Sequence, residues 1–128
     1  MTILIEEHAP ATAAGTQDWH DVCWFDDLET GWGEAAWIDG RQVALFRFAD
    51  GSVHAADQRC PATGSQVMAR GIMGGRSTDA GLVHTIASPL HKETYRLDTG
   101  ECLTSPGLSL PVHRVRVEDG RLWVGFGL

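Results

Sequence analysis

Three Asp-Gly pairs, at residues 39–40, 50–51 and 119–120, constrain the fold of this chain more than any other feature. Both residue types tolerate the positive φ that a two-residue hairpin turn requires, so each pair predicts a tight reversal between two strands. Short apolar runs with an alternating pattern flank the pairs, and little of the chain has the period of a helix. The pattern predicts an antiparallel, all-β domain.

The runs around the turns and in the middle of the chain define the predicted strands. They are residues 19–24, 34–38, 41–48, 52–56, 82–87, 94–97, 112–117 and 122–126. Successive side chains of a strand point to opposite faces. In the third run this alternation places Val43 and Leu45 on one face. It places Ala44, Phe46 and Phe48 on the other face.

The chain reads as one domain with a tail. Its 128 residues suit a single domain. Residues 1–17 have no regular period and are predicted to be a flexible N-terminal tail, and residues 18–128 form the domain. Within it, residues 58–106 leave the hairpin pattern, with two Pro-containing loops, a brief helical piece near 66–70 and a Gly-rich stretch over 71–81. Such an excursion is usually functional or the remains of something functional.

The charge and cysteine content exclude several classes of protein. With 10 basic and 17 acidic residues, a net charge of −7 argues against nucleic acid or an anionic membrane as partner. No apolar run approaches the roughly 20 residues of a membrane span, and the start lacks a signal-peptide pattern. Three cysteines are too few, and odd in number, for a disulfide scaffold. We expect reduced thiols and a cytoplasmic location.

Two loops carry a resemblance to a known family. Residues 59–64 read Arg-Cys-Pro-Ala-Thr-Gly, and residues 87–92 read Ala-Ser-Pro-Leu-His-Lys, with Tyr-Arg-Leu-Asp-Thr-Gly-Glu-Cys-Leu following at 95–103. In this order, between hairpin groups, they resemble the two cluster-binding loops of a Rieske-type iron–sulfur domain. The resemblance covers residues 18–128 and implies a Rieske-like antiparallel β-sandwich with an inserted small subdomain, about 58–106, that carries the two loops.

The resemblance also implies that half of the cluster ligands are missing. A Rieske cluster is held by two cysteines on one iron and two histidines on the other. Here the first loop keeps Cys60 but has Ala62 at the histidine position, and the second keeps His91 but has Ser88 at the cysteine position. We therefore expect no [2Fe–2S] cluster, no metal site and no catalytic residue. A residual metal site at Cys60 and His91, with His84 as a third donor, stays open as an alternative, as does a redox-active Cys60.

The second loop is similar to that of one group within the family, the small subunits of NAD(P)H-dependent assimilatory nitrite reductase. This resemblance implies a non-catalytic accessory subunit. Its partner would be the large catalytic subunit, which converts nitrite to ammonia and is expected to carry FAD, sirohaem and a 4Fe–4S cluster. The former cluster tip then becomes a docking surface, with these candidate residues: Cys60, Pro61, Gly64, Pro89, His91 and Lys92.

Two other functions remain open. The chain could be an electron carrier with an unusual cluster or a single iron, because each loop keeps one ligand. It could also be an adaptor domain for another oxidoreductase, such as an oxygenase. Among its five tryptophans, most are predicted to pack in the core or on the sheets, and Trp32, between Gly31 and Gly33, is the interface candidate.

Overall fold

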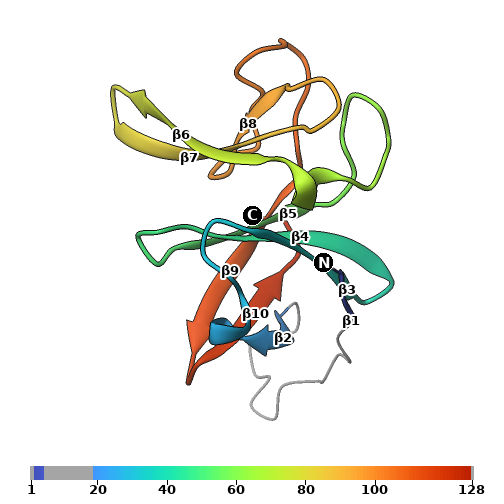
Figure 1. Cartoon of the computed structure of the whole chain (residues 1–128), viewed down its shortest axis with the longest axis vertical. Helices are drawn as coiled ribbons and strands as arrows, with labels where there is room; N and C mark the ends of the chain where they lie inside the picture. Colours follow the sequence, from blue (N-terminus) through green and yellow to red (C-terminus); the bar gives the residue numbers. More distant parts are fainter. Residues whose placement is uncertain (1, 5–18, 128) are drawn as a thin grey trace.

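The computed structural model describes residues 2–4 and 19–127, which form ten strands and two single-turn 3₁₀ helices (Figure 1). The elements are β1 (Thr2–Leu4), β2 (Trp19–Trp24), η1 (Phe25–Asp27), β3 (Gly33–Ile38), β4 (Arg41–Arg47), β5 (Val53–Asp57), η2 (Met68–Arg70), β6 (Ile72–Thr78), β7 (Gly81–Ala87), β8 (Thr94–Arg96), β9 (Val112–Glu118) and β10 (Arg121–Gly125). Within this part of the chain, no helix is long and apolar enough to cross a membrane.

The strands form two sheets. Seven of them pair in the order β1-β3-β4-β5-β9-β10-β2, and the other three pair in the order β6-β7-β8. Every pair is antiparallel except β1 with β3. In Figure 1 the three-stranded sheet and its loops lie above β3, β4 and β5, and β9, β10 and β2 lie below these strands. The predicted all-β class, with an inserted small subdomain, is confirmed.

The Asp-Gly pairs at 39–40 and 119–120 form two-residue turns as predicted, whereas the pair at 50–51 lies in a three-residue turn, 49–51, closed by the Phe48 N–H donating to the Ser52 carbonyl at 2.9 Å. Asp39 and Gly40 have φ values of 48° and 76°, and Asp119 and Gly120 have 53° and 77°. In these two hairpins the residues before and after the pair face each other, Ile38 with Arg41 and Glu118 with Arg121, so the turn consists of the Asp-Gly pair alone. Two successive residues at positive φ define the hairpin turn whose twist matches the strands.

Two hydrophobic cores lie on opposite faces of β4. The upper core, between the two sheets, contains Ala35, Ala44, Phe46, Phe48, Ala56, Cys60, Met68, Ala69, Ile86, Tyr95, Leu97, Cys102, Leu110 and Val112. The lower core contains Val22, Cys23, Leu28, Ala36, Ile38, Val43, Leu45, Ala55, Leu122 and Val124. The predicted division of the residues of β4 between two faces is therefore confirmed.

Two segments differ from the prediction. The Gly-rich stretch contains a seven-residue strand, β6, which pairs along its whole length with β7. In the predicted tail, β1 runs parallel to β3, and residues 5–17 lie outside the described residues. The short helical piece is confirmed as η2.

Most tryptophans were predicted to pack in the core or on the sheets, and the core part of this prediction is wrong, since none of the five is buried. Trp24, Trp32 and Trp37 are 53%, 54% and 44% exposed. Trp19 and Trp123 are half-buried, under the guanidinium groups of neighbouring arginines. For the tryptophans on β2, β3 and β10, the alternation that buries one face of a strand puts the ring on the other face, whereas Trp32 lies in the loop before β3. Trp32 stays an interface candidate by its exposure.

An ionic contact ties the end of β5 to β9. Asp57 Oδ1 lies 2.7 Å from Nε2 of the buried His113 and 3.3 Å from a guanidinium nitrogen of Arg41. Because the Gly127 N–H donates to His113 Nδ1, Nε2 carries the proton that Asp57 accepts. Burial alone would raise the pKa of Asp57, but the bonds and charges of His113 and Arg41 outweigh it and lower that pKa.

We expect alanine at Gly100 to destabilise the fold far more than alanine at Gly107. The φ values are 84° and 90°, so both variants force a side chain into the left-handed region, at about 1 kcal/mol. Only at Gly100 would the new Cβ also strike a backbone carbonyl, that of Leu110; at Gly107 nothing lies within 4 Å. Urea unfolding should give a loss of about 1 kcal/mol for Gly107→Ala and of about 3 kcal/mol or more for Gly100→Ala. Equal losses would contradict this packing.

We expect Asp57→Asn to lower stability at neutral pH and to lose that effect in acid. The pKa of Asp57 is lower in the folded than in the unfolded chain, so its contribution exists above the unfolded value of about 3.9 and vanishes as pH falls through the folded value. At pH 7 the loss should be about 1 to 3 kcal/mol. Urea unfolding at pH 7 and near pH 3 measures it, with Asp39→Asn in an exposed turn as control. A difference that persists undiminished near pH 3 would rule out this origin.

Candidate functional site

The first of the two predicted loops closes on its own backbone. After β5, the Cys60 N–H donates to the Ser65 carbonyl at 2.7 Å and the Gly64 N–H donates to the Cys60 carbonyl at 2.8 Å. Gly64 has a φ of 81°, which a residue with a Cβ rarely adopts. Gln58 anchors the base of the loop, because its side-chain oxygen accepts the Ala69 N–H at 2.7 Å. The loop therefore keeps its shape through protein hydrogen bonds.

The second loop is a similar turn after β7. The Ser88 N–H donates to the Glu93 carbonyl at 2.8 Å, and the Lys92 N–H donates to the Ser88 carbonyl at 3.0 Å. Lys92 has a φ of 63°, so the chain reverses there without a glycine. Residues 89–92 are exposed at the tip of this turn.

The two loops meet through the side chains of Cys60 and Ser88. Cys60 Sγ lies 3.4 Å from Ser88 Oγ, and both residues are fully buried. Burial would raise the pKa of the Cys60 thiol, but hydrogen bonds from Ser88 and from the side chain and backbone of Thr63 outweigh it and lower that pKa. The thiol is thus polarised by its hydrogen bonds but shielded from solvent, so a redox-active Cys60, the alternative kept above, would have to react from a buried position.

Tyr95 lies in the same buried layer. Its side chain is fully buried, and among the described residues its hydroxyl has no hydrogen-bond partner. Burial, together with Cys102 and Cys60, raises the pKa of Tyr95 to about 12. A neutral phenol therefore stands in the layer that the two loops cover.

The other two ligand positions do not join this contact. Ala62 and His91 are exposed, and His91 forms no hydrogen bond or ion pair within the described part of the chain. Across residues 2–4 and 19–127, no group of three or more histidine, cysteine, aspartate or glutamate side chains is arranged to hold a metal ion. The four positions are thus split, with two facing inward and two outward.

His84, considered above as a third donor, is engaged elsewhere. Its Nδ1 lies 3.0 Å from His54 Nε2 and 3.2 Å from Ser52 Oγ, and its ring stacks on Phe48 with centroids 3.9 Å apart. Burial, and then the neighbouring His84, lower the pKa of His54. This group of rings joins β5 of the large sheet to β7 of the small sheet.

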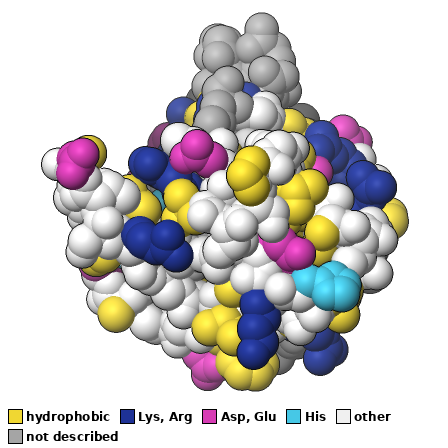
Figure 2. Space-filling view, turned by 90° about the horizontal axis from the view of Figure 1, so that it is seen from above, with side chains coloured by type: hydrophobic (Ala, Val, Ile, Leu, Met, Phe, Trp, Pro, Cys, Tyr) yellow, Lys and Arg dark blue, Asp and Glu magenta, His cyan; other side chains and the backbone are white. Residues whose placement is uncertain are grey.

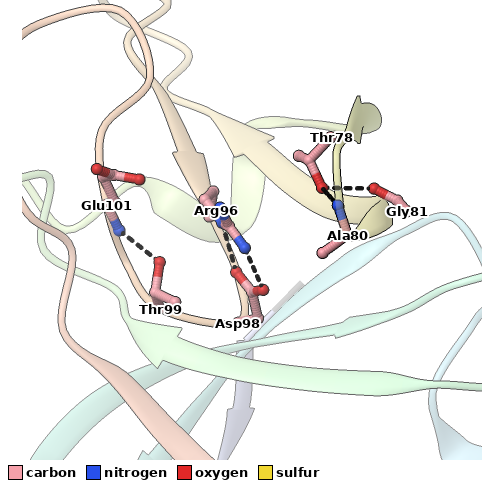
Figure 3. A network of polar contacts seen from close by, with 7 residues as sticks. All are labelled: Thr78, Ala80, Gly81, Arg96, Asp98, Thr99 and Glu101. Atoms are coloured by element: carbon pink, nitrogen blue, oxygen red, sulfur yellow. Dashed lines mark hydrogen bonds and ion pairs between the residues drawn. The ribbon is translucent and has the colours of Figure 1, made fainter.

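The segment after β8 forms a turn held by its own hydrogen bonds. The Arg96 guanidinium donates to both carboxylate oxygens of Asp98, at 2.9 and 2.7 Å, and the Glu101 N–H donates to Thr99 Oγ1 at 3.2 Å (Figure 3). These bonds shape a turn in which Gly100 packs on the Leu110 backbone. The residues at 95–103 that carry part of the resemblance thus have a structural role.

The residues present do not match the ligands of a Rieske cluster. Such a cluster needs two thiolates and two imidazoles converging on one pair of irons. Here one thiol, Cys60, is hydrogen-bonded to Ser88, Ala62 offers no donor atom, and His91 points to the surface. A serine hydroxyl ionises far less readily than a thiol.

The exposed part of the loops is a mixed surface. Figure 2 views the molecule from above, the side on which the loops lie in Figure 1, and shows hydrophobic, basic, acidic and histidine side chains interspersed on this face. We define the tip surface as Pro89, Leu90, His91 and Lys92. Leu90, which the sequence analysis passed over, is 48% exposed there. Pro61 and Gly64 are half-buried beside it, whereas Cys60 is buried and cannot contact a partner.

Comparisons with known proteins agree with this geometry. The model of the Rieske-like [2Fe–2S] domain family matches residues 18–125. The nitrite reductase (NADH) small subunit of Salmonella typhimurium is 32% identical over 103 residues, which are 80% of this chain and 92% of that protein. A Mycobacterium tuberculosis protein, described as an NADH-dependent nitrite reductase small subunit, has a crystal structure with a TM-score of 0.77 and 42% identity, covering 86% of this chain and 96% of that one.

A longer relative contains the same domain within one polypeptide. The nitrite reductase NAD(P)H large subunit of Klebsiella oxytoca is 34% identical over 122 residues, which are 91% of this chain but 12% of that subunit. The chain therefore spans about an eighth of this relative. Together with the family match over residues 18–125, these similarities show that the chain belongs to the Rieske-like domain family, within the group of nitrite reductase small subunits.

Proposed function

We propose that this chain is a non-catalytic accessory subunit that binds the large subunit of an assimilatory NAD(P)H-dependent nitrite reductase. The observation that carries the proposal is the buried contact between Cys60 and Ser88. These residues stand at two of the four cluster-ligand positions, and their side chains contact each other where a cluster would need both of them as ligands of iron. The loops keep their shape through backbone bonds, so the fold can persist as a rigid scaffold without iron. No [2Fe–2S] cluster then resides on this chain.

The redox chemistry belongs to the partner under this proposal. FAD, sirohaem and a 4Fe–4S cluster, which carry electrons from NAD(P)H to nitrite, would lie on the large subunit. This chain stabilises or orients that subunit through the tip surface. Three unpaired, buried cysteines support a cytoplasmic location, because that compartment keeps thiols reduced.

We expect the purified chain to contain neither iron nor acid-labile sulfide. Anaerobic purification followed by metal analysis and a sulfide assay measures both, with a Rieske ferredoxin carried through the same steps as a positive control. Two irons and two sulfides per chain would overturn the proposal. That result would favour the electron-carrier alternative instead.

We expect the chain to bind the large subunit through the tip surface. Leu90 and Val117 are each 48% exposed, but Val117 lies on β9, away from the loops. Leu90→Glu should weaken binding to the purified large subunit about tenfold or more, because it places a charge in an apolar contact, while Val117→Glu should not. Titration calorimetry with the large subunit measures both.

Turnover provides the second test of the accessory role. Nitrite reduction and thermal stability of the large subunit should both fall when this chain is absent and recover when it is added. If the large subunit alone matched the complex in both respects and did not bind the chain, the accessory role would be wrong. Recovery of the chain with a different oxidoreductase from its own host would favour the adaptor alternative.

A further inference from the structure

The hairpin of β6 and β7 is an arm with one free edge. β6 pairs only with β7 in the described part of the chain, and its seven residues make it the longest strand at the edge of either sheet. Thr78 closes the tip, since its hydroxyl donates to the Gly81 carbonyl at 2.7 Å and accepts the Ala80 N–H at 3.2 Å (Figure 3). Figure 2 shows the arm at the left, projecting beyond the rest of the molecule.

The register shows which backbone groups of β6 lack a partner. Thr78 faces Gly81 across a two-residue turn, and in such a hairpin the closing pair is hydrogen-bonded. Alternation then directs the N–H groups of Met73, Gly75 and Ser77 to the free edge. The neighbouring strand agrees, because the His84 carbonyl points away from β6 and accepts the Leu97 N–H.

This edge lacks the features that usually block strand addition. It contains no proline and one charged residue, Arg76, and the adjacent Gly74 and Gly75 leave the backbone uncovered. The first residue, Ile72, is 62% exposed. An exposed edge with these properties is a template for another strand.

A groove lies where the edge begins. It has a volume of about 450 Å³ and is lined by Trp32, Ile72, Met73 and the backbone around Gly33 and Gly71. Neither glycine could carry a side chain, because a Cβ at Gly33 would strike the Ala69 carbonyl and one at Gly71 the Ala87 carbonyl. The close approach of these backbones places the exposed Trp32 ring next to the start of β6.

The charges on this side favour an acidic occupant. Arg70 lines the groove and Arg76 lies on β6 itself; both are exposed, and neither forms a salt bridge within the described residues. The single acidic residue of the arm, Asp79, is at its tip. On a chain of net charge −7, two cations beside a free strand edge select a segment that combines apolar and acidic side chains.

The free edge of β6 begins close in the fold to the tip surface. Ile72, the first residue of β6, pairs with Ala87, and Ser88 and the tip surface follow directly. In the Klebsiella oxytoca relative, a domain similar to this chain belongs to the large subunit itself, so its surfaces and the rest of that subunit share one polypeptide. A segment of a large subunit that reaches the tip surface would therefore lie beside the start of β6.

We propose that an extended acidic and apolar segment of the large subunit adds to β6 as a further strand and seats one apolar side chain in the groove beside Trp32. The backbone groups of β6 supply the hydrogen bonds, and the groove and the two arginines select the sequence. The identity of the partner rests on the proposed function, whereas the site rests on the edge, the groove and the charges.

Paired substitutions at Gly75 test the strand addition. Proline at Gly75 removes the outward N–H and leaves the β6–β7 ladder intact, as proline does on an edge strand. Gly75→Ala is the matched control, because it keeps the N–H, and the nearest atom to its Cβ belongs to the flexible Leu82 side chain, at 3.1 Å, with the Val83 carbonyl oxygen at an ordinary contact distance of 3.5 Å. Binding to the purified large subunit should weaken about tenfold or more with proline and about twofold or less with alanine. Trp32→Ala should weaken it as proline does.

Amide exchange in the wild-type complex provides a test that needs no variant. The Met73, Gly75 and Ser77 amides should exchange rapidly in the free chain and at least about tenfold more slowly in the complex. If wild type and Gly75→Pro bound equally and these amides stayed unprotected, strand addition would be wrong while the accessory role stood. If the wild-type chain did not bind the large subunit, both would fail. If the amides were already protected in the free chain, a second copy or another segment of this chain would be the occupant and the proposal would be overturned.

Discussion

The fold depends on the burial of β4 on both faces. Val43 and Leu45 fill the lower core, while Ala44 and Phe46 fill the upper core, and all four are fully buried. A slip of one residue in the pairing of this strand would exchange the two faces. Every element above β4, including the Cys60–Ser88 contact and Tyr95, rests on a core that this strand helps to build. The two loops are thus positioned by packing from below.

The elements that the sequence predicts well are those with a local signal. Asp-Gly pairs favour their turns through backbone φ alone. In β4 four consecutive apolar residues, 43–46, point alternately to the two faces of the strand, and this identifies both cores. The strand β6 cannot be predicted in this way. Its run of Met, Gly, Gly and Arg has no apolar period and becomes a strand only by pairing with β7. Strand formation there is set by the tertiary context, which no window of sequence contains.

The candidate site shows the same division. Its ligand positions are recognisable from two short motifs, and so is the replacement of a histidine ligand by Ala62 and of a cysteine ligand by Ser88. The direct contact between Cys60 and Ser88 joins residues 28 apart in the chain, and the exposure of Leu90 and Trp32 depends on which face of a loop turns outward. The pairing of His84 with His54 likewise requires two sheets to be placed against each other. Contacts of this kind follow from the assembled fold and not from spacing.

The ring cluster around His84 makes the packing of the small sheet on the large sheet sensitive to acid. The two imidazoles face each other at 3.0 Å, with Phe48 beneath, Ser52 and Asp50 at one side and Asp98 near His54. One proton between His54 Nε2 and His84 Nδ1 bonds the sheets, whereas a second proton at this contact would turn both nitrogens into donors and place a charge on a half-buried ring. Because the pKa of His54 is lower in the folded chain, unfolded molecules take up this proton first as pH falls below about 6.5. The contact between the large sheet and the small sheet that carries the loops is therefore most stable near neutral pH and becomes weaker in acid.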